Sequence, residues 1–597
     1  MKLKYSDIIR NQPTINIGII GHVAHGKSSF TKSMTGTKTQ KFSSEQERNI
    51  TIHIGYANTK IFLDSKGMLH TASSKTANLV DDQGNDMKLI KHISLVDCPG
   101  HEAYMANMIS GSAIMDSSVL VVASNENVPQ AQTYEHLQAV QNVNINDFII
   151  LQNKMDLVKE EENDKIYKDI KKFVKGTNAE KSIIIPSSIQ NDINKDEILK
   201  ALVNMPEIDR KINEPARMII IRSFDINKAH TIFTELSGGV IGGSLISGIF
   251  NLDDVVELRP GIVIKVEEEA SEETFKYRPI TTTIRSLQSD TSKMEFALPG
   301  GLVGIGLDID PSLAKSNGLI GQIVGSIGTL PDVYSAVKLD FEELKRYDNL
   351  DDSFKMNEQI LISVNSMNIK GNILHMSKKK KKKYIKIQLE KPICVSDGQK
   401  VAIFKNILNR WILVAKSVIN GGIICNIDDP DNHYEKLCKE NTFEKEKIEI
   451  DYDLEMNNYE SSSYEKMLEN IKFKSNSNYN IKVIPPEVKI INKETVFSNF
   501  ENVCNSIKVD NDDSVNYSNI INGFIDNELS CSSQAANGKL VIKGKFKGKI
   551  FESVIAKFIK SYTKCKSCGS YKCKLIKENR NLFRSCLDCG SKSCIEK

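Results

Sequence analysis

The sequence lacks long apolar runs, an apolar leader and a disulfide pattern. None of its 597 residues belongs to an apolar run of about 18 or more, the length a membrane-spanning helix needs. The first residues, Met1–Asp7, have no apolar core of the kind found in secretion signals. Six of the 12 cysteines are scattered, as is usual for reduced thiols. These absences predict a cytoplasmic protein without a membrane contact.

Most of the chain carries no excess of positive charge, whereas its last 61 residues are strongly basic. The net charge is +3, yet residues 537–597 alone hold 16 Lys and Arg against 4 Asp and Glu. Such a basic segment indicates contact with a polyanion, nucleic acid above all, and a solvated lysine-rich surface is the alternative. At roughly 100–200 residues per domain, the chain has room for about three to six domains.

A phosphate-binding pattern, G-x-x-x-x-G-K-[ST], occupies Gly21–Ser28. It lies between a predicted buried strand and the first turns of a predicted helix, so that backbone N–H groups can face phosphate oxygens. Lys27 is expected to reach the β- and γ-phosphates and Ser28 to ligate Mg²⁺; a chance match in a glycine-containing turn is the alternative. The predicted nucleotide contacts in this segment are Gly21, Ala24, His25, Gly26, Lys27, Ser28 and Ser29.

Two later segments supply groups that phosphate-loop enzymes place around the metal and the γ-phosphate. Thr51, in a polar segment before a predicted strand, is the expected hydroxyl that closes over Mg²⁺. Asp97 ends another predicted strand, and Gly100 can turn its N–H toward the γ-phosphate. His101 lies where it can orient the attacking water, with a surface histidine as the alternative. We predict catalytic roles for His101, Thr51 and Lys27.

The segment Asn153–Asp156, with the sequence N-K-M-D, follows a further predicted strand and indicates which base is bound. The Asp156 carboxylate can accept two hydrogen bonds that guanine donates and adenine cannot, which makes the discrimination large. Asn153 and Lys154 are expected to pack around the base, and Ser188 to lie near it. Alternating strands and helices predict an α/β fold with a parallel sheet and ligands at the strand ends.

The sequences of these segments resemble those of translational GTPases of the elongation factor Tu class. Within that class they are most similar to the gamma subunit of eukaryotic and archaeal translation initiation factor 2. Ala24 between two histidines and the run Arg48–Ile52 favour that subunit over the elongation factor. The resemblance implies a GTPase domain over residues 1–212 that binds GTP or GDP with Mg²⁺. Two departures stand out: Ala57–His92 contains no cysteine where the family usually carries a four-cysteine zinc knuckle, and Ile189 replaces an alanine.

From Ala216 the sequence alternates β-branched residues with glycines, which is typical of small β-barrels. We predict one β-barrel over residues 213–329 and a second over 330–422. The first resembles the gamma subunit's second domain, which implies aminoacyl-tRNA binding together with the GTPase domain and docking of an alpha-type subunit. Lys378–Lys383 is a run of six lysines. We interpret it as a solvated hairpin tip, with a phosphate-backbone contact as the alternative.

Residues 423–463 hold 12 acidic residues and 4 lysines, which predicts a solvated linker within 423–480. A helical pattern returns at Tyr464–Ile471, and its apolar stripe must dock on another surface because so short a helix is marginal alone. An α+β domain is expected over 481–560. Helix and domain resemble the beta subunit of the same factor, whose matching helix binds the gamma GTPase domain. The residues that carry this resemblance are Pro485–Val488, Phe497–Phe500 and Leu540–Phe546.

Two C-x-x-C hooks, separated by 17 residues, lie near the end of the chain. This spacing suits tetrahedral coordination of Zn²⁺ by four thiolates in a zinc ribbon, placed here over 561–597; chance pairing of thiols is the alternative. Cys573 and Cys594 fall outside the spacing and are interpreted as bystanders. We predict one structural zinc ion, held by Cys565, Cys568, Cys586 and Cys589.

Together these features predict a fusion of a gamma-like and a beta-like subunit. The resemblance implies a GTP-dependent carrier that delivers initiator methionyl-tRNA to the small ribosomal subunit and hydrolyses GTP on start-codon selection. A GTPase-activating factor is then an expected partner. Two alternatives stay open: an elongation-type carrier of a special aminoacyl-tRNA, and a non-hydrolysing RNA-binding scaffold.

Overall fold

The computed structural model of the chain forms two compact units. The first comprises Met1–Gln40, Thr51–Asn153 and Lys165–Asn470; the second comprises Lys41–Ile50, Lys154–Asp164 and Ile471–Lys597. In the part of the chain that the structure describes, no helix is both long and apolar enough to cross a lipid bilayer. The described residues are 2–40, 45, 51–101, 104–142, 145–207, 210–228, 237–266, 275–344, 353–379, 382–407, 410–430, 432–441, 447–454, 458–471, 483–492, 494–508, 515–565, 570–578, 581–587 and 591–595.

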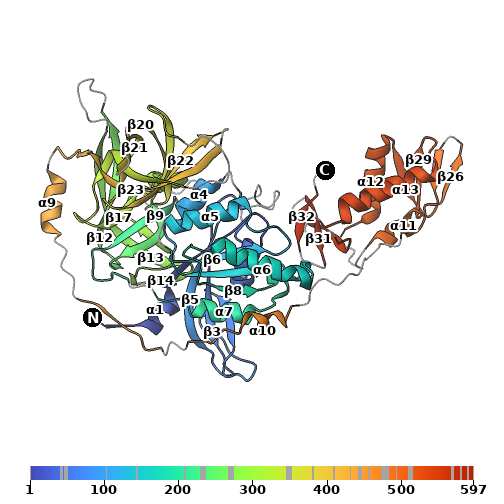
Figure 1. The fold of residues 1–597 in the computed structure, drawn as a ribbon, viewed down its shortest axis with the longest axis horizontal. Helices are drawn as coiled ribbons and strands as arrows, with labels where there is room; N and C mark the ends of the chain where they lie inside the picture. Colours follow the sequence, from blue (N-terminus) through green and yellow to red (C-terminus); the bar gives the residue numbers. More distant parts are fainter. Residues whose placement is uncertain are drawn as a thin grey trace. The chain divides into compact units, whose positions relative to one another are not determined.

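The amino-terminal domain is built on a seven-stranded sheet in the order β4-β3-β5-β2-β6-β7-β8. Figure 1 labels β3, β5, β6 and β8 of this sheet. Strand β2 pairs in parallel with β5 and β6, β6 with β7, and β7 with β8, so their carboxyl ends meet at one edge. Strands β3 and β4 add an antiparallel hairpin. The strands are β2 (Ile15–Ile20), β3 (Gly55–Leu63), β4 (Leu69–Ser73), β5 (Lys88–Asp97), β6 (Ser117–Ala123), β7 (Phe148–Asn153) and β8 (Ile183–Pro186).

Helices cover both faces of this sheet, because its central strands are apolar on both sides. All six residues of β2 are buried; Ile17 and Ile19 face one core, and Ile20 faces the other. Helices α2 (Lys27–Thr35) and α7 (Lys195–Val203) pack in the first core, and α4 (Met105–Ser112), α5 (Ala131–Asn142) and α6 (Glu160–Val174) in the second. The predicted parallel α/β domain is confirmed.

The next segment closes into a six-stranded barrel, since β12 and β13 pair with each other at the ends of the path β12-β17-β9-β10-β16-β13. Its core consists of aliphatic residues such as Ile220, Leu258 and Ile305. The elements are β9 (Arg217–Phe224), β10 (Val240–Ser247), β11 (Phe250–Asn251), β12 (Val255–Lys265), β13 (Phe275–Ser289), β14 (Ser292–Met294), β15 (Phe296–Ala297), β16 (Val303–Leu307), α8 (Pro311–Ala314) and β17 (Ile323–Ser326).

A second closed barrel follows, in the order β18-β21-β20-β19-β22-β23, so both predicted barrels are confirmed. The lysine run falls in the hairpin of β20 and β21, where Lys378 pairs with Lys383; Lys380 and Lys381 lie outside the described residues. The strands are β18 (Val333–Glu343), β19 (Gln359–Val364), β20 (Met367–Lys379), β21 (Lys382–Cys394), β22 (Lys400–Ile407) and β23 (Arg410–Ile424).

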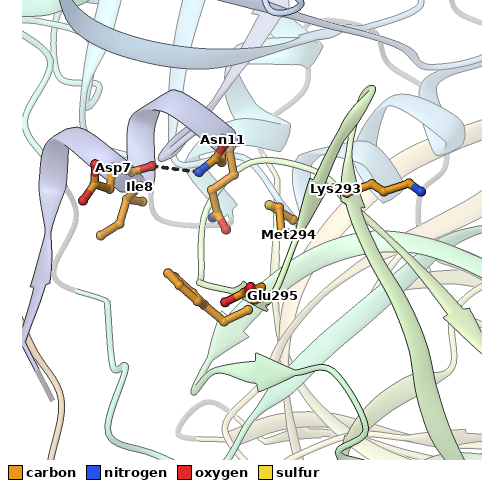
Figure 2. Close-up of a pocket in the computed structure, with 8 residues that line it drawn as sticks. Asp7, Ile8, Asn11, Lys293, Met294 and Glu295 are labelled. Atoms are coloured by element: carbon orange, nitrogen blue, oxygen red, sulfur yellow. Dashed lines mark hydrogen bonds between the residues drawn. The ribbon is translucent and has the colours of Figure 1, made fainter. Parts of the chain in front are cut away.

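The first helix of the chain, α1 (Tyr5–Asn11), contacts the first barrel as well as the sheet. A pocket of about 180 Å³ remains between α1 and the β14–β15 segment (Figure 2). None of its lining residues belongs to the predicted nucleotide site. They are Asp7, Ile8, Asn11, Gln12, Lys293, Met294, Glu295 and Phe296.

The acidic stretch 423–463, called the connector below, differs from the solvated linker expected from its composition. It contains β24 (Asn426–Ile427), which pairs with β13, α9 (His433–Glu440), and β25 (Glu449–Asp451), which pairs in parallel with β1 (Lys2–Lys4). Tyr434 donates a 2.5 Å hydrogen bond to the buried Glu257 carboxylate of the first barrel. The connector is therefore ordered by specific contacts with β1, β13 and Glu257, although its acidic composition favours exposure to solvent.

The second unit contains a four-stranded sheet, β26-β27-β29-β28, with three helices. Its core includes four fully buried phenylalanines, among them Phe497 and Phe558. A three-stranded ribbon, β30-β31-β32, shares this core through Leu575 and Ile595. The elements are β26 (Val488–Ile491), β27 (Glu494–Phe497), α11 (Phe500–Ile507), α12 (Tyr517–Leu529), β28 (Ser533–Ala536), β29 (Lys539–Lys543), α13 (Gly548–Phe558), a π-helical turn (Ile559–Thr563), β30 (Cys573–Glu578), β31 (Asn581–Cys586) and β32 (Lys592–Cys594).

Candidate nucleotide site and metal centre

The phosphate-binding loop joins β2 to α2 and depends on backbone positions with positive φ. These are Gly21 (φ 137°), Ala24 (φ 61°) and Gly26 (φ 108°). A Cβ added at Gly21 would lie 2.3 Å from the Val121 carbonyl oxygen, and one at Gly26 would lie 2.4 Å from Nδ2 of Asn153. Close approach to neighbouring strands therefore requires both glycines. Strand, loop and helix follow one another as the sequence pattern predicts, with Ala24 and Ser29 exposed.

The amine of Lys27 lies inside this loop. It is 6% exposed, and its Nζ donates hydrogen bonds to the carbonyl oxygens of Gly21 (2.8 Å) and His22 (2.7 Å). Burial lowers the pKa of Lys27 to about 8, although nearby Asp97 acts in the opposite direction. A Cβ at Gly100 would lie 2.2 Å from Lys27 Nζ. The structure thus brings together Lys27 and Gly100, which the sequence predicts separately as partners of the terminal phosphates.

His136, on α5, supports the loop and was missed by sequence reasoning. Its side chain is fully buried, and its Nδ1 accepts a 3.1 Å hydrogen bond from the Gly21 N–H. Burial, and then the positive charge of Lys27, holds the pKa of His136 well below its usual value, so the imidazole stays neutral and can accept. The only signal in the sequence was a polar residue on the same helical face as Val140, which is also buried.

Two hydroxyl groups predicted to ligate Mg²⁺ lie close together. Ser28 Oγ and Thr51 Oγ1 are 3.0 Å apart, and Thr51 is 7% exposed. Adjacent ligands of an octahedral Mg²⁺ ion with bonds of about 2.1 Å lie roughly 3 Å apart, so this pair fits neighbouring positions on one ion. Asp97 is fully buried at the end of β5 and accepts a 2.5 Å hydrogen bond from Thr39 Oγ1. Thr39, which the sequence did not single out, therefore orients the carboxylate that is predicted to lie on the metal side.

Asn153, at the end of β7, connects the phosphate-binding loop to the predicted base-binding segments. Its Nδ2 donates to the His25 carbonyl oxygen at 2.8 Å, and its Oδ1 accepts from the Ile189 N–H at 3.1 Å. Lys154 follows with φ 61°, and Asp156 lies in the next 3₁₀ turn (Met155–Leu157). The Asn153 side-chain amide thus links the phosphate-binding loop at His25 to the segment at Ile189, beside the predicted base site.

Ser188 and Ile189 follow the last strand of the sheet. Ser188 is 1% exposed, and its Oγ accepts a hydrogen bond from Asn191 Nδ2 at 2.9 Å. The side chain of Ile189 packs in the core that also contains Phe30 and Leu202. The core therefore accommodates the larger side chain that replaces the usual alanine.

Two histidines of the predicted site differ in how they are placed. His101 is half-buried, with its ring centroid 5.8 Å from that of Tyr104. The His25 ring turns inward, with Nδ1 3.0 Å from the Val121 carbonyl oxygen and Nε2 3.3 Å from the Glu126 carboxylate. His25 thus offers its backbone, rather than its ring, to the loop. Of the switch segment before Thr51, Arg48–Ile50 lies outside the described residues.

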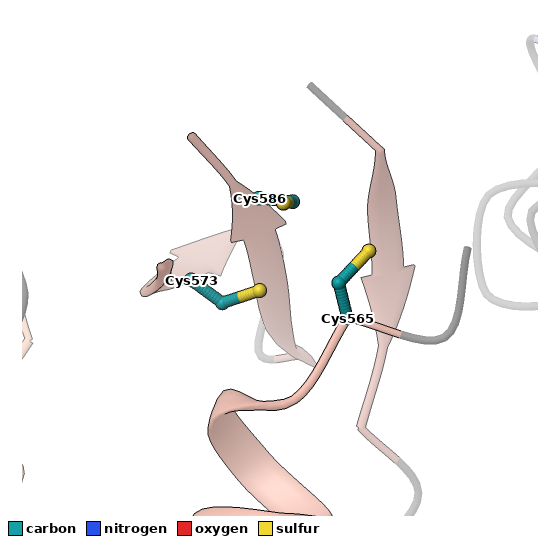
Figure 3. Close-up of side chains that lie close together, drawn as sticks. All are labelled: Cys565, Cys573 and Cys586. Carbon is teal, nitrogen blue, oxygen red and sulfur yellow. The ribbon is translucent and has the colours of Figure 1, made fainter. Parts of the chain in front are cut away.

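Three thiols converge in the carboxyl-terminal ribbon (Figure 3). Sγ atoms of Cys565, Cys573 and Cys586 lie within 4.8 Å of one another, and all three residues are buried. Cys573, which its spacing predicts to be a bystander, lies in this thiol cluster, because β30 pairs with β31 so that Cys573 stands opposite Cys586. Cys568 and Cys589, the other two predicted ligands, lie outside the described residues. A buried group of thiols is the donor set that Zn²⁺ prefers.

The first cysteine of each hook makes a similar backbone hydrogen bond. The Cys565 N–H donates to the Ser570 carbonyl oxygen at 2.8 Å, and the Cys586 N–H donates to the Ser591 carbonyl oxygen at 2.9 Å. In both cases the acceptor lies five residues after the cysteine. Arg584 ties the ribbon to the preceding helix by donating from Nη1 to two backbone carbonyl oxygens, each at 2.8 Å. The donor set and its scaffold fit a structural Zn²⁺ ion.

The cysteine-free insert Ala57–His92 is organised by hydrogen-bonded turns. The Asp64 carboxylate accepts the backbone N–H groups of Lys66 (2.9 Å) and Met68 (2.8 Å), and Asp81 accepts two in a later turn, both at 2.9 Å. These bonds, with a serine hydroxyl at Asp81, hold the pKa of both carboxyls below the usual range. Within the described ranges, three or more potential metal ligands converge only at the cysteines.

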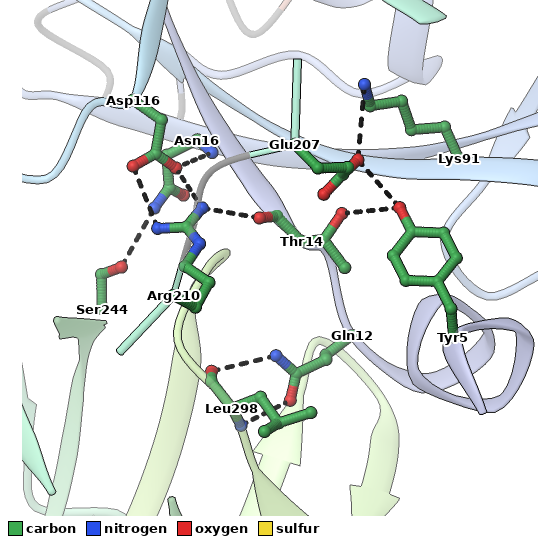
Figure 4. Close-up of polar contacts among 10 residues, drawn as sticks. All are labelled: Tyr5, Gln12, Thr14, Asn16, Lys91, Asp116, Glu207, Arg210, Ser244 and Leu298. Carbon is green, nitrogen blue, oxygen red and sulfur yellow. Dashed lines mark hydrogen bonds and ion pairs between the residues drawn. The ribbon is translucent and has the colours of Figure 1, made fainter. Parts of the chain in front are cut away.

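A polar network fixes the seven-stranded sheet against the first barrel (Figure 4). Arg210 donates to both carboxylate oxygens of Asp116, at 3.1 and 2.8 Å, and to the Thr14 carbonyl oxygen at 2.7 Å. Asn16, on β2, donates to Ser244 Oγ on β10 at 3.0 Å. The strand that leads into the phosphate-binding loop is therefore bonded directly to a barrel strand.

Three family models match the chain. "Elongation factor Tu GTP binding domain" matches residues 12–207, and "Initiation factor eIF2 gamma, C terminal" matches 338–419. A third model, described as a domain found in initiation factors 2B and 5, matches 472–592. The first two lie in the sheet domain and the second barrel, and the third covers the α+β domain and the ribbon. The carboxyl-terminal model is therefore described from other initiation factors than the model that matches the second barrel.

Individual proteins are similar to the larger part of the chain. "Eukaryotic translation initiation factor 2 subunit 3" of Drosophila melanogaster is 40% identical over 438 residues, covering 70% of this chain and 90% of that protein. "Eukaryotic translation initiation factor 2 subunit gamma" of Schizosaccharomyces pombe is 40% identical over 425 residues (68% and 94%). The protein of the same description from Encephalitozoon cuniculi is 38% identical over 425 residues (70% and 94%).

Proposed function

Because the chain belongs to the gamma-subunit family of translation initiation factor 2, and is a translational GTPase with a beta-like part fused to it, we propose that it carries initiator methionyl-tRNA to the small ribosomal subunit. GTP-bound protein holds the tRNA, and GTP is hydrolysed when the start codon is selected. The convergence of Lys27, Gly100, Ser28 and Thr51 supports the GTP-dependent part of this proposal, since a hydrolysable triphosphate with Mg²⁺ requires these groups to lie together.

Each group at the site has a proposed part in binding or hydrolysis. Lys27 exchanges its carbonyl partners for phosphate oxygens, and Ser28 and Thr51 ligate the Mg²⁺ ion, which neutralises charge on the β- and γ-phosphates. Asp97, oriented by Thr39, accepts hydrogen bonds on the metal side. His101 orients the attacking water.

The base is read at the other end of the site. Asp156 accepts two hydrogen bonds from guanine, while Asn153 and Lys154 enclose the base and Ser188 lies beside it. The zinc ion stabilises the ribbon without taking part in hydrolysis, and Cys565 and Cys586 hold it with their neighbouring thiols.

The proposed partners follow from this role. The barrels and the GTPase domain hold the aminoacyl-tRNA, an alpha-type subunit docks on the first barrel, and a GTPase-activating factor triggers hydrolysis in the cytoplasm. The basic carboxyl-terminal part is a further candidate for nucleic-acid contact, since residues 537–597 hold 16 Lys and Arg.

Filter binding of tRNA by the purified full chain tests the proposal. Initiator methionyl-tRNA should be retained with GTP far more than with GDP, and more than an elongator methionyl-tRNA. Preference for the elongator would instead favour an elongation-type carrier. Retention that ignores the nucleotide, with no ribosome-stimulated GTP turnover, would favour a non-hydrolysing scaffold. Zinc measured in the same sample should be about one ion per chain.

A further inference from the structure

The short helix α10 (Tyr464–Leu468), at the head of the beta-like part, covers the edge strand β8 of the GTPase sheet. Met467 is 2% exposed and packs with Leu199 and Leu202 in the core on one face of the sheet. Tyr464 packs against the core on the other face and stacks on Tyr167, with ring centroids 4.0 Å apart. The helix thus closes an otherwise open sheet edge and contacts both cores.

The hydroxyl of Tyr464 reaches the strand that ends in the predicted base-binding segment. It donates a 2.5 Å hydrogen bond to Oε1 of Gln152, which is fully buried. Gln152 immediately precedes Asn153 on β7, and its carbonyl oxygen accepts the Ser187 N–H at 2.8 Å. Tyr464 is therefore one hydrogen bond and one peptide unit away from Asn153.

Asn194 makes a second connection, from α10 to the end of β8. Its Nδ2 donates to the carbonyl oxygens of Pro186 and Met467, both at 2.8 Å, and its Oδ1 accepts from Asn470 Nδ2 at 2.7 Å. Asn194 is 4% exposed, so these bonds are shielded from water. Pro186 lies two residues before Ser188, the residue predicted to lie beside the base.

We propose that the docked helix α10 is a working part of the guanine-binding site and that its attachment slows nucleotide release. Tyr464 and Asn194 are positioning residues: they hold the ends of β7 and β8, from which Asn153 and Ser188 extend. The inference rests on the proposed assignment of Asn153–Asp156 and Ser188 to the base. Because Asn153 also bonds to the phosphate-binding loop, displacement of its strand disturbs both ends of the nucleotide.

Fusion makes this support permanent. In a separate subunit the helix would bind and leave, whereas here the connector keeps it at a local concentration in the millimolar range or above. A nucleotide site built in this way needs no second protein to complete its base-binding end. The expected consequence is a release rate set by whether α10 is docked.

The test compares two Tyr→Phe substitutions in the full-length chain. Tyr464→Phe removes the hydroxyl that bonds to Gln152 and keeps the ring stacked on Tyr167; release of fluorescent mant-GDP should become about three- to tenfold faster, the effect of one lost hydrogen bond. Tyr459→Phe is the matched control. Its hydroxyl is buried without a hydrogen-bond partner in the described part of the chain, so the rate should not change. Thermal unfolding verifies that both variants are folded.

A second nucleotide tests whether the effect acts through the base. Inosine diphosphate lacks the exocyclic amine of guanine, so it depends less on the base-binding segment. Tyr464→Phe should therefore accelerate release of mant-IDP less than release of mant-GDP, and Asn194→Ala should show the same difference. Equal acceleration of both nucleotides, or a Tyr464→Phe rate equal to that of Tyr459→Phe, would overturn the inference. A wild-type chain without preference for GDP over IDP would instead overturn the proposed base assignment.

Discussion

The buried amine of Lys27 predicts how nucleotide affinity depends on pH. Burial lowers the pKa of Lys27 to about 8 in the nucleotide-free protein, whereas phosphate oxygens favour the charged form. Below pH 8 the amine is protonated before GDP arrives, and binding takes up little proton. Above pH 8 the amine is mostly neutral, so binding must first add a proton. Affinity should therefore fall as the pH rises through 8.

The size of the effect follows from this pKa. If Lys27 must be protonated in the complex, the observed affinity falls by the factor 1 + 10^(pH − pKa), which makes GDP binding about tenfold weaker at pH 9 than at pH 7. The corresponding free-energy change is about 1.4 kcal/mol. Proton uptake per GDP should be about one tenth at pH 7 and about three quarters at pH 8.5.

Isothermal titration calorimetry in buffers with different ionisation enthalpies measures this uptake directly. GMP is the matched control, because it lacks the β-phosphate that Lys27 is proposed to reach, and its binding should show no dependence on the buffer. Nearby histidines do not interfere, since burial lowers the pKa of both His22 and His136 and leaves them neutral at pH 8 and above. A GDP enthalpy at pH 8.5 that does not change with the buffer would refute the reasoning.

Three further outcomes are expected. After cleavage at a protease site placed at residues 455–457, the two halves of the chain should stay associated, as measured by analytical ultracentrifugation. Met467→Ala should weaken that association by about 2–4 kcal/mol, because its side chain is buried. Separation of the unsubstituted halves at micromolar concentration would contradict docking of α10. Thr51→Ala should raise the Mg²⁺ concentration needed for GTP binding more than for GDP binding, and equal shifts would mean that its hydroxyl does not follow the γ-phosphate. The Cys565→Ser variant should lose zinc and unfold at a lower temperature. The Cys573→Ser variant should retain zinc but release it faster to a chelator. An unchanged release rate would show that Cys573 does not contact the metal.

Features written in contiguous residues were predictable, because local chemistry determines them. The phosphate-binding loop needs glycine at positions 21 and 26, where φ is positive and a Cβ would clash, and lysine at the start of the helix, and each requirement appears as a letter at a fixed spacing. The parallel sheet was equally readable, since β2 and β6 are apolar on both faces. In both the loop and the strands, the residues that determine the structure lie within a few positions of one another in the sequence.

Features that depend on register or on distant partners were not predictable. Cys573 enters the thiol cluster because β30 pairs with β31 in one particular register, which the spacing of the hooks does not specify. Thr39 becomes important only when Asp97, 58 residues away in the chain, lies beside it. His136 is distinguished only by the Gly21 N–H that points at it. In each case a tertiary contact gives an ordinary residue its role.

The parallel pairing of β25 with β1 changes how much chain is free to move between the second barrel and α10. From its composition, the whole connector of about 40 residues is predicted to be a flexible, solvated linker. Because β25 ends at Asp451, Asp453 bonds to Ser6 at 2.6 Å, and the Tyr459 backbone bonds to Asn204 at 2.6 and 3.0 Å, only five residues separate the two anchor points Asp453 and Tyr459. Shortening a flexible chain from about 40 residues to about five raises the concentration of its end near the attachment point roughly twentyfold. An affinity tag that displaced β1 would therefore lengthen the tether of the beta-like part, so the amino terminus is a poor place to modify this molecule.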